Sequence, residues 1–198
     1  MSGRGALTGS SPVEALFGGS FDPVHIGHLI VAEALAETLG ARIRFLPARE
    51  QPFKGAAHQA TPEQRAAMLE LAVAGNPRFA VERIELGLPV PSYSVRTLRA
   101  LAEREPGNRF TFLLGADAAR DLPQWWEVES LPGLADVVVF ARPGTAVPQH
   151  KLIARVVEVP AVEVSATAVR ERVRRGESIR YLVPEAVREF VTVHGLYR

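Results

Sequence analysis

The sequence predicts one doubly wound α/β domain, in which helices cover both faces of a mostly parallel sheet. Short apolar runs of strand length alternate with segments of helical period along nearly the whole chain. The length of 198 residues suits one domain. A glycine-rich turn also joins the first apolar run to the first helical segment, and open parallel sheets place their ligand crevice at such turns.

The first half of the chain predicts two strands and two helices. Residues 13–18 and 42–47 are apolar runs of strand length, and residues 61–75 predict a helix that begins with a capping threonine and a proline. Residues 48–60 show no period, which is typical of a functional or disordered loop. The first helix is predicted to end at Gly40 and to bury a face made of Leu29, Ala32, Leu35, Ala36 and Leu39.

The second half continues the alternation. Strands are predicted over residues 78–86, 109–115, 135–144 and 154–160, and helices over residues 92–105, 165–176 and 184–195. Residues 1–12 are small, polar and rich in glycine, so they predict a flexible tail ahead of a domain over residues 13–198.

Composition excludes several kinds of function. The net charge of +1 gives no reason to expect a nucleic-acid partner, and no stretch approaches the roughly 20 apolar residues that cross a membrane. The absence of cysteine excludes disulfides and thiolate metal sites and fits a cytoplasmic location. The oligomeric state stays open, and a homo-oligomer is possible.

The turn after the first predicted strand reads "LFGGSFDPVHIGHL". Gly18 and Gly19 allow the backbone to come close to a ligand, and the start of the following helix offers unpaired N–H groups to a phosphate. His25 and His28 are three residues apart, so they share one face of the first helical turn, and Gly27 leaves space over that face. Both imidazoles can therefore donate hydrogen bonds to one bound polyanion. The alternative is a tight turn with two surface histidines.

These residues carry a family resemblance. "GGSFDPVHIGH" resembles the H-x-G-H signature of the nucleotidyltransferase superfamily. Three further segments, "PSYSVRTL", "LLGADAARDLPQWW" and "VSATAVRERVRRGESIRYLVP", together with "GLY" near the end, resemble the bacterial nicotinate-nucleotide adenylyltransferase family. The resemblance covers nearly the whole chain after residue 13, and the expected fold is a single Rossmann-like domain.

The resemblance implies a reaction in which nicotinate mononucleotide and ATP give nicotinate adenine dinucleotide and pyrophosphate, a step of NAD biosynthesis. The nucleophile is the phosphate of the mononucleotide, whose second pKa of about 6 leaves it largely ionised at pH 7. No protein base is needed, so positioning and positive donors are expected to supply most of the catalysis. Mg²⁺ is the expected cofactor, held mainly by the ATP phosphates and water.

The predicted ATP-binding residues lie in two segments. In the first turn, Asp22 and Pro23 are expected to shape the backbone, and Phe21 can equally be a packing residue. In the C-terminal segment Ser165 can bind phosphate, cap the helix, or do both. The predicted ATP-binding set is Gly18, Gly19, Ser20, Phe21, His25, His28, Ser165, Thr167 and Arg170. The predicted catalytic set is His25, His28, Lys54 and Arg170.

The predicted mononucleotide-binding residues are Lys54, Ser94, Asp117, Trp125 and Trp126. The resemblance implies that Trp125 stacks on the pyridine ring, that Ser94 lies near the nicotinate carboxylate, and that Asp117 contacts ribose or caps a helix. The family usually has a histidine before the loop cation, whereas this chain has Phe53. Lys54 is therefore the expected cation of the loop.

Three other functions compete with this interpretation. A sister adenylyltransferase would act on nicotinamide mononucleotide or phosphopantetheine, which a substrate panel distinguishes. An aminoacyl-tRNA synthetase fragment also carries "HIGH", but needs a lysine-rich second motif that the chain lacks. A non-catalytic nucleotide-binding module would bind ATP and release no pyrophosphate.

Overall fold

The computed structural model of this protein describes residues 13–52 and 58–198. The predicted N-terminal tail (residues 1–12) lies outside the described residues, as do Phe53 and Lys54 in the predicted loop. No helix of the described part is long and apolar enough to cross a membrane.

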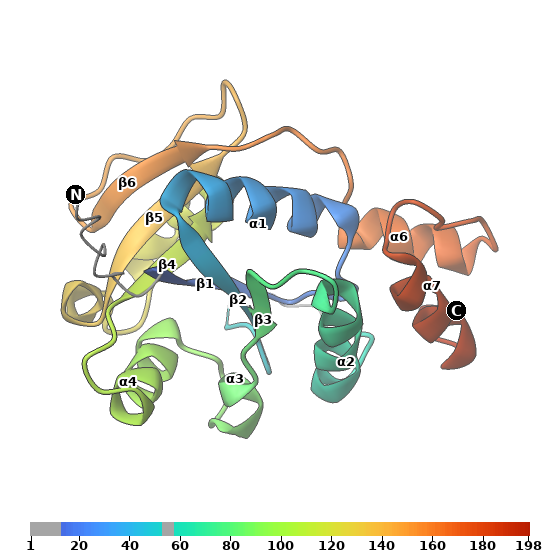
Figure 1. Cartoon of the computed structure of the whole chain (residues 1–198), viewed down its shortest axis with the longest axis horizontal. Helices are drawn as coiled ribbons and strands as arrows, with labels where there is room; N and C mark the ends of the chain where they lie inside the picture. Colours follow the sequence, from blue (N-terminus) through green and yellow to red (C-terminus); the bar gives the residue numbers. More distant parts are fainter. Residues whose placement is uncertain (1–12, 53–57) are drawn as a thin grey trace, which may run out of the picture.

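Six strands form one sheet, all parallel, in the order β3-β2-β1-β4-β5-β6 (Figure 1). The strands are β1 (Val13–Gly19), β2 (Ala41–Pro47), β3 (Phe79–Val81), β4 (Phe110–Gly115), β5 (Ala135–Ala141) and β6 (Ile153–Glu158). The chain reverses its winding direction between β1 and β4, so a crevice for ligands is expected beyond the carboxyl ends of these two strands.

Helices connect the strands and close the chain. They are α1 (Ile26–Leu39), α2 (Pro62–Val73), α3 (Ile84–Gly87), α4 (Ser94–Arg104), α5 (Ala116–Arg120), α6 (Ala166–Arg174) and α7 (Glu185–Val193), with 3₁₀ turns η1 (Leu122–Gln124) and η2 (Val128–Gly133). Helices α1 and α2 cover one face of the sheet, and α4 with α5 and the 3₁₀ turns covers the other. Helix α7 packs on α2 and places the C-terminus beside that layer (Figure 1). The predicted doubly wound α/β fold is confirmed.

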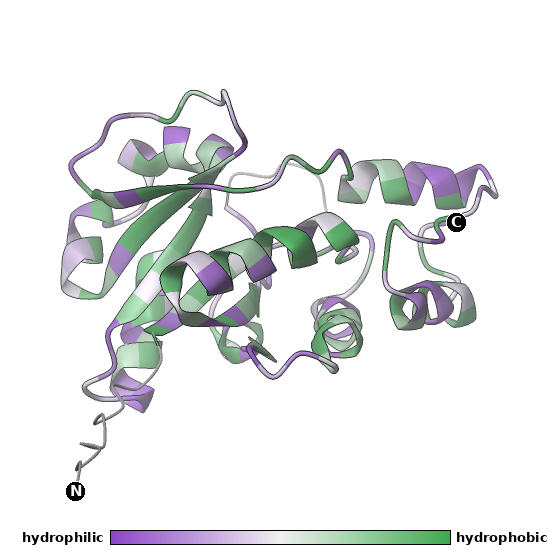
Figure 2. Ribbon diagram, turned by 45° about the horizontal axis from the view of Figure 1, so that its top comes forward, coloured by the Kyte–Doolittle hydropathy of each residue, from purple (hydrophilic) through white to green (hydrophobic). Residues whose placement is uncertain are grey.

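The hydrophobic core has two layers because the strands are apolar on both sides. Alternate residues of β1 belong to different layers: Ala15 and Phe17 pack toward α1, and Leu16 packs toward α4. The central strands are accordingly mostly green in Figure 2, whereas the helices carry both colours. The predicted apolar face of the first helix is confirmed, with Ala32 and Leu35 fully buried.

One local prediction was wrong. The strand predicted over residues 78–86 ends at Val81, and residues 84–87 form α3. The side chain of Glu82 accepts a hydrogen bond of 2.9 Å from the backbone N–H of Ile84, which turns the chain away from the sheet edge.

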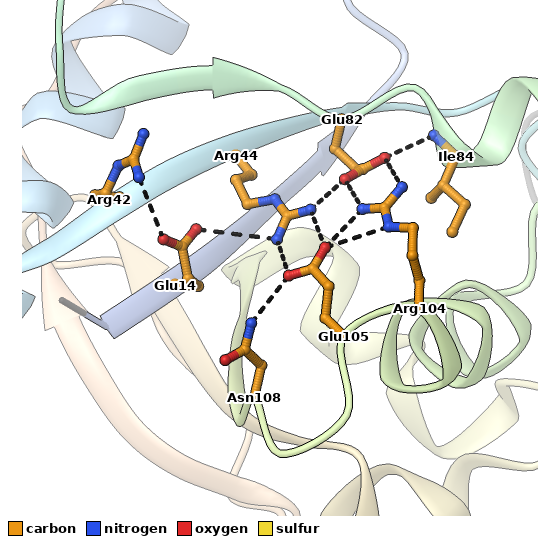
Figure 3. A network of polar contacts seen from close by, with 8 residues as sticks. All are labelled: Glu14, Arg42, Arg44, Glu82, Ile84, Arg104, Glu105 and Asn108. Carbon is orange, nitrogen blue, oxygen red and sulfur yellow. Dashed lines mark hydrogen bonds and ion pairs between the residues drawn. The ribbon is translucent and has the colours of Figure 1, made fainter. Parts of the chain in front are cut away.

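A network of charged side chains ties the first three strands to the end of α4 (Figure 3). The buried carboxylate of Glu82 binds both Arg44 and Arg104, and Arg44 also donates to Glu105 at 2.8 and 2.9 Å. None of the eight residues in Figure 3 lines the cavity described below. The network therefore supports the scaffold and lies apart from the candidate site.

Candidate active site

All the predicted site residues that the structure describes line one cavity of about 1280 Å³. It opens at the carboxyl ends of β1, β4 and β5, where the sheet topology places a ligand crevice. Cavities for drug-sized ligands have about 300–1,000 Å³. This one is larger, so it offers room for more than a single small molecule.

The turn between β1 and α1 forms the floor of the cavity. A Cβ atom on Gly19 would lie 2.9–3.1 Å from ring atoms of Phe21, so this position requires glycine. Phe21 adopts a positive φ of 50° and buries its ring against Phe17 and Phe45, with the His28 ring 5.0 Å away. Phe21 therefore acts as a packing residue that supports His28.

The two histidines stack on each other with ring centroids 3.7 Å apart. Nδ1 of His28 accepts a hydrogen bond of 3.2 Å from the backbone N–H of His25, so a neutral His28 carries its proton on Nε2. Burial lowers the pKa of His25 to about 4, which makes this imidazole neutral at pH 7. Both rings line the cavity and can act there as N–H donors rather than as a pair of full charges.

The C-terminal segment brings a second set of donors to the same turn. Ser165 caps α6 by accepting a hydrogen bond of 3.1 Å from the backbone N–H of Ala168. Arg170, one turn further on, donates to the carbonyl of Asp22 at 2.7 Å and to the hydroxyl of Thr167 at 3.1 Å. The guanidinium is thus held in place beside the first turn, and the N-termini of α1 and α6 both open on the cavity.

Asp22 is predicted to shape the turn, and its carboxylate connects the turn to backbone groups that lie far along the chain. Its carboxylate accepts hydrogen bonds from the backbone N–H groups of Gln59 at 2.9 Å and Ala60 at 3.2 Å. These contacts fix the point at which the loop after β2 returns to the turn.

Aromatic side chains also line the cavity. Trp125 is half-buried and meets Phe112 edge to face, with centroids 6.2 Å apart. Trp126 is more exposed and stacks on Tyr93 at 5.1 Å, with the guanidinium of Arg96 5.5 Å from its ring centroid. Since Tyr93 covers one face of Trp126, Trp125 is the better platform for a flat ligand.

The two polar residues predicted for the mononucleotide also line the cavity. Ser94 begins α4, directly after Tyr93. Asp117 is the second residue of α5, and its strongly exposed carboxylate lies 3.4 Å from the Arg120 guanidinium. Their predicted roles stay predictions, as does that of Lys54.

Reasoning from the sequence did not single out three residues that line the cavity: Glu85, Tyr93 and Arg142. Arg142 directly follows β5, so its place at the carboxyl edge of the sheet was a usable signal. Glu85 is 5% exposed, and burial raises its pKa to about 7. No comparable sequence signal marks Glu85, because it lies inside a helix of only four residues.

A family model described as cytidylyltransferase-like matches residues 16–172. A probable nicotinate-nucleotide adenylyltransferase of a Roseiflexus species is 42% identical over 202 residues, covering 96% of this chain and 99% of the relative. A protein of the same description from Thermus thermophilus is 45% identical over 184 residues, covering 92% and 98%.

Solved structures agree at the level of the fold. A Plasmodium falciparum nicotinic acid mononucleotide adenylyltransferase complexed with NaAD superposes with a TM-score of 0.77 at 17% identity, covering 94% of this chain and 98% of that chain. A nicotinate-nucleotide adenylyltransferase structure from Vibrio parahaemolyticus gives a TM-score of 0.69 at 17% identity, covering 92% and 99%. By the matched family model and by relatives above 40% identity along almost their whole length, this chain belongs to the nicotinate-nucleotide adenylyltransferase family.

Proposed function

We propose that this protein transfers the adenylyl group of ATP to nicotinate mononucleotide, giving nicotinate adenine dinucleotide and pyrophosphate. The observation that carries the proposal is a single cavity lined both by hydrogen-bond donors suited to phosphate and by aromatic side chains. The names of the relatives support the same reaction.

In this reaction a phosphate oxygen of the mononucleotide attacks the α-phosphorus of ATP. The bond from that phosphorus to the oxygen bridging to the β-phosphate breaks, and pyrophosphate leaves with the electron pair. Charge grows on the leaving group, so donors aimed at the β- and γ-phosphates stabilise the transition state. In this proposal the Nε2–H of His28 and the guanidinium of Arg170 take this role, while His25 and Ser165 add neutral donors.

The mononucleotide binds against the aromatic side chains that line the cavity. The pyridine ring stacks on Trp125, and the hydroxyl of Ser94 lies near the nicotinate carboxylate. Asp117 contacts ribose hydroxyls. Trp126, which stacks on Tyr93, lines the cavity next to Trp125 in the sequence. Lys54 supplies a cation from the loop after β2.

Mg²⁺ fits this site as an ion carried by the nucleotide. The described residues contain no group of three histidine, aspartate or glutamate side chains that could hold a metal ion. ATP phosphates and water therefore supply its ligands, with Asp117 and Asp121 as single carboxylates in the cavity wall. When bound, the ion neutralises charge on the phosphate oxygens. The cytoplasmic location and the possible homo-oligomer stay predictions.

A pyrophosphate-release assay with ATP and Mg²⁺ tests the proposal. The panel contains nicotinate mononucleotide, nicotinamide mononucleotide and phosphopantetheine, each at the same concentration. We expect the highest kcat/KM with nicotinate mononucleotide. Preference for another acceptor would assign a sister adenylyltransferase activity, and ATP binding without release of pyrophosphate would leave only a nucleotide-binding module.

A further inference from the structure

Arg65 is a charged residue in the core. It lies on α2, its side chain is 0% exposed, and it heads the set of large side chains that are fully buried. A buried guanidinium is costly unless hydrogen bonds and counter-charges compensate it, and an apolar side chain of similar size serves packing at least as well. The contacts of Arg65 therefore need a reason beyond filling the core.

The guanidinium of Arg65 joins two loops of the candidate site. Nη1 donates a hydrogen bond of 2.6 Å to the carbonyl of Ser20, in the turn after β1. Nη2 donates at 3.2 Å to the carbonyl of Arg49, in the loop after β2. A planar guanidinium can hold two carbonyls in a fixed relation, whereas the ammonium of a lysine is a single flexible point.

Three carboxylates interact electrostatically with this cation. Asp22 and Glu85 both interact electrostatically with Arg65, as does Glu63 on its own helix, and these charges oppose the lowering of its pKa by burial. Asp22 is itself held by the hydroxyl of Tyr197 at 2.8 Å. Glu85 accepts a hydrogen bond of 2.8 Å from the hydroxyl of Thr97 on α4. The hub of Asp22, Arg65, Glu85 and Tyr197 thus connects α2, α3, α4 and the C-terminus.

Arg65 does not line the cavity, although Ser20, Asp22 and Glu85 do. It therefore acts on the reaction only through the residues it holds. The turn that contains Ser20 is proposed to receive the triphosphate, and the loop that contains Arg49 lines the same cavity through Gln51 and Pro52. Their separation sets how closely the two anionic substrates meet.

We infer that Arg65 is a positioning residue that fixes the ATP-binding turn and the described start of the loop after β2 at the separation that adenylyl transfer requires. This inference rests on the proposed function. Each loop keeps its own substrate contacts when Arg65 changes, so the separate affinities depend little on it. The rate of the chemical step depends on it strongly, because a misplacement of about 1 Å can cost about 10²-fold in rate.

The test compares Arg65→Lys with the wild type, using the surface substitution Arg83→Lys as a matched control. Arg83 is exposed and pairs with Glu70, which lies on α2 as Arg65 does. Replacing Arg83 is therefore expected to leave kcat and both Kd values unchanged. Three quantities are measured at a temperature well below the unfolding midpoint of each protein: kcat, the Kd of a non-hydrolysable ATP analogue, and the Kd of nicotinate mononucleotide. We expect kcat to fall about 10- to 100-fold, while each Kd stays within about threefold.

A kcat within about threefold of wild type would overturn the inference, as would a parallel loss of both affinities that accounts for the lower rate. If Arg65→Lys does not fold, Tyr197→Phe removes one hydroxyl from the hub, with the exposed Tyr181→Phe as its control. The same separation of kcat from Kd is expected there, and unchanged kinetics would overturn the inference. A wild-type protein that releases no pyrophosphate with any acceptor would overturn the proposed function itself, which is a different outcome.

Discussion

The hydroxyl of Tyr197, the penultimate residue, donates a hydrogen bond of 2.8 Å to Oδ1 of Asp22, which lies 175 residues earlier in the chain. Burial, reinforced by Asp22, raises the pKa of Tyr197, so the phenol remains a donor. A second contact supports the same junction, because the backbone N–H of Ile26 donates to the carbonyl of Leu182 at 2.9 Å. The C-terminal segment is therefore part of the frame that holds the first turn of the site.

Asp22→Asn is expected to destabilise the fold. The substitution removes the charge that balances Arg65 and leaves an amide where several donors converge. Breaking a buried charge arrangement typically costs about 3–5 kcal/mol in the free energy of unfolding. Urea unfolding measures the loss, and Asp136→Asn at an exposed ion pair should cost less than about 1 kcal/mol. Equal, small losses for the two variants would show that Asp22 does not stabilise the hub.

His28→Ala is expected to lower kcat by about 10² to 10³, because we propose that its Nε2–H donates to phosphate oxygens whose charge grows in the transition state. The KM for ATP should change far less. Steady-state kinetics measures both, and circular dichroism checks the fold. His194→Ala, at an exposed histidine on the end of α7, serves as the control. A folded His28→Ala that keeps more than about a third of kcat would contradict a catalytic role, since this is under 1 kcal/mol of barrier.

Trp125→Ala is expected to weaken nicotinate mononucleotide more than ATP. A lost stacking partner costs on the order of 1 kcal/mol beyond the lost buried area. Trp126→Ala should weaken it less, because Tyr93 already stacks on that ring. Calorimetric titration with each ligand measures the difference. Equal weakening of both ligands, together with a lower unfolding temperature, would assign Trp125 to the core alone.

Glu85→Gln is expected to change how stability depends on pH. The Glu85 carboxyl keeps its proton in the folded state up to about pH 7, whereas the unfolded carboxyl loses it near 4.5. The contribution of Glu85 to the free energy of unfolding therefore falls as pH rises from about 4.5 to about 7, by on the order of 3 kcal/mol. The lowered pKa of His25 acts in the opposite direction, so urea unfolding is compared between the two proteins, and the free energy of unfolding of the wild type minus that of Glu85→Gln should fall across this range. The difference between the two proteins isolates Glu85, because His25 is intact in both; parallel curves would refute the shifted pKa.

Glu82→Gln is expected to lower stability and leave catalysis unchanged. The Glu82 carboxylate lies between Arg44 and Arg104 and is 6% exposed, so its loss leaves these two cations with Glu105 as their remaining shared carboxylate. We expect a loss of about 3 kcal/mol in the free energy of unfolding. Both kcat and KM at low temperature should match the wild type, since the network lies outside the cavity. A change in kcat would show that the network reaches the site.

The sequence by itself determined the architecture and the location of the site. Hydrophobic period and the glycine and proline signals are local, so they predicted the first helix and the strands correctly, apart from the end of β3. Parallel strands bring their carboxyl ends to one edge, and this rule explains why residues as distant as His28, Trp125 and Arg170 share one cavity. The resemblance to known motifs supplied the chemistry of the substrates.

Only the tertiary structure decided which polar residues are buried together. The helical period of α2 does not predict that the cation of Arg65 is buried in the core. Asp22 and Tyr197 are hydrogen-bonded although they lie 175 residues apart in the chain. The end of β3 depends on the side chain of Glu82, which also binds arginines from β2 and α4. Such contacts depend on side-chain rotamers and on the packing of distant elements. Local sequence patterns contain neither kind of information, because they report only neighbours along the chain.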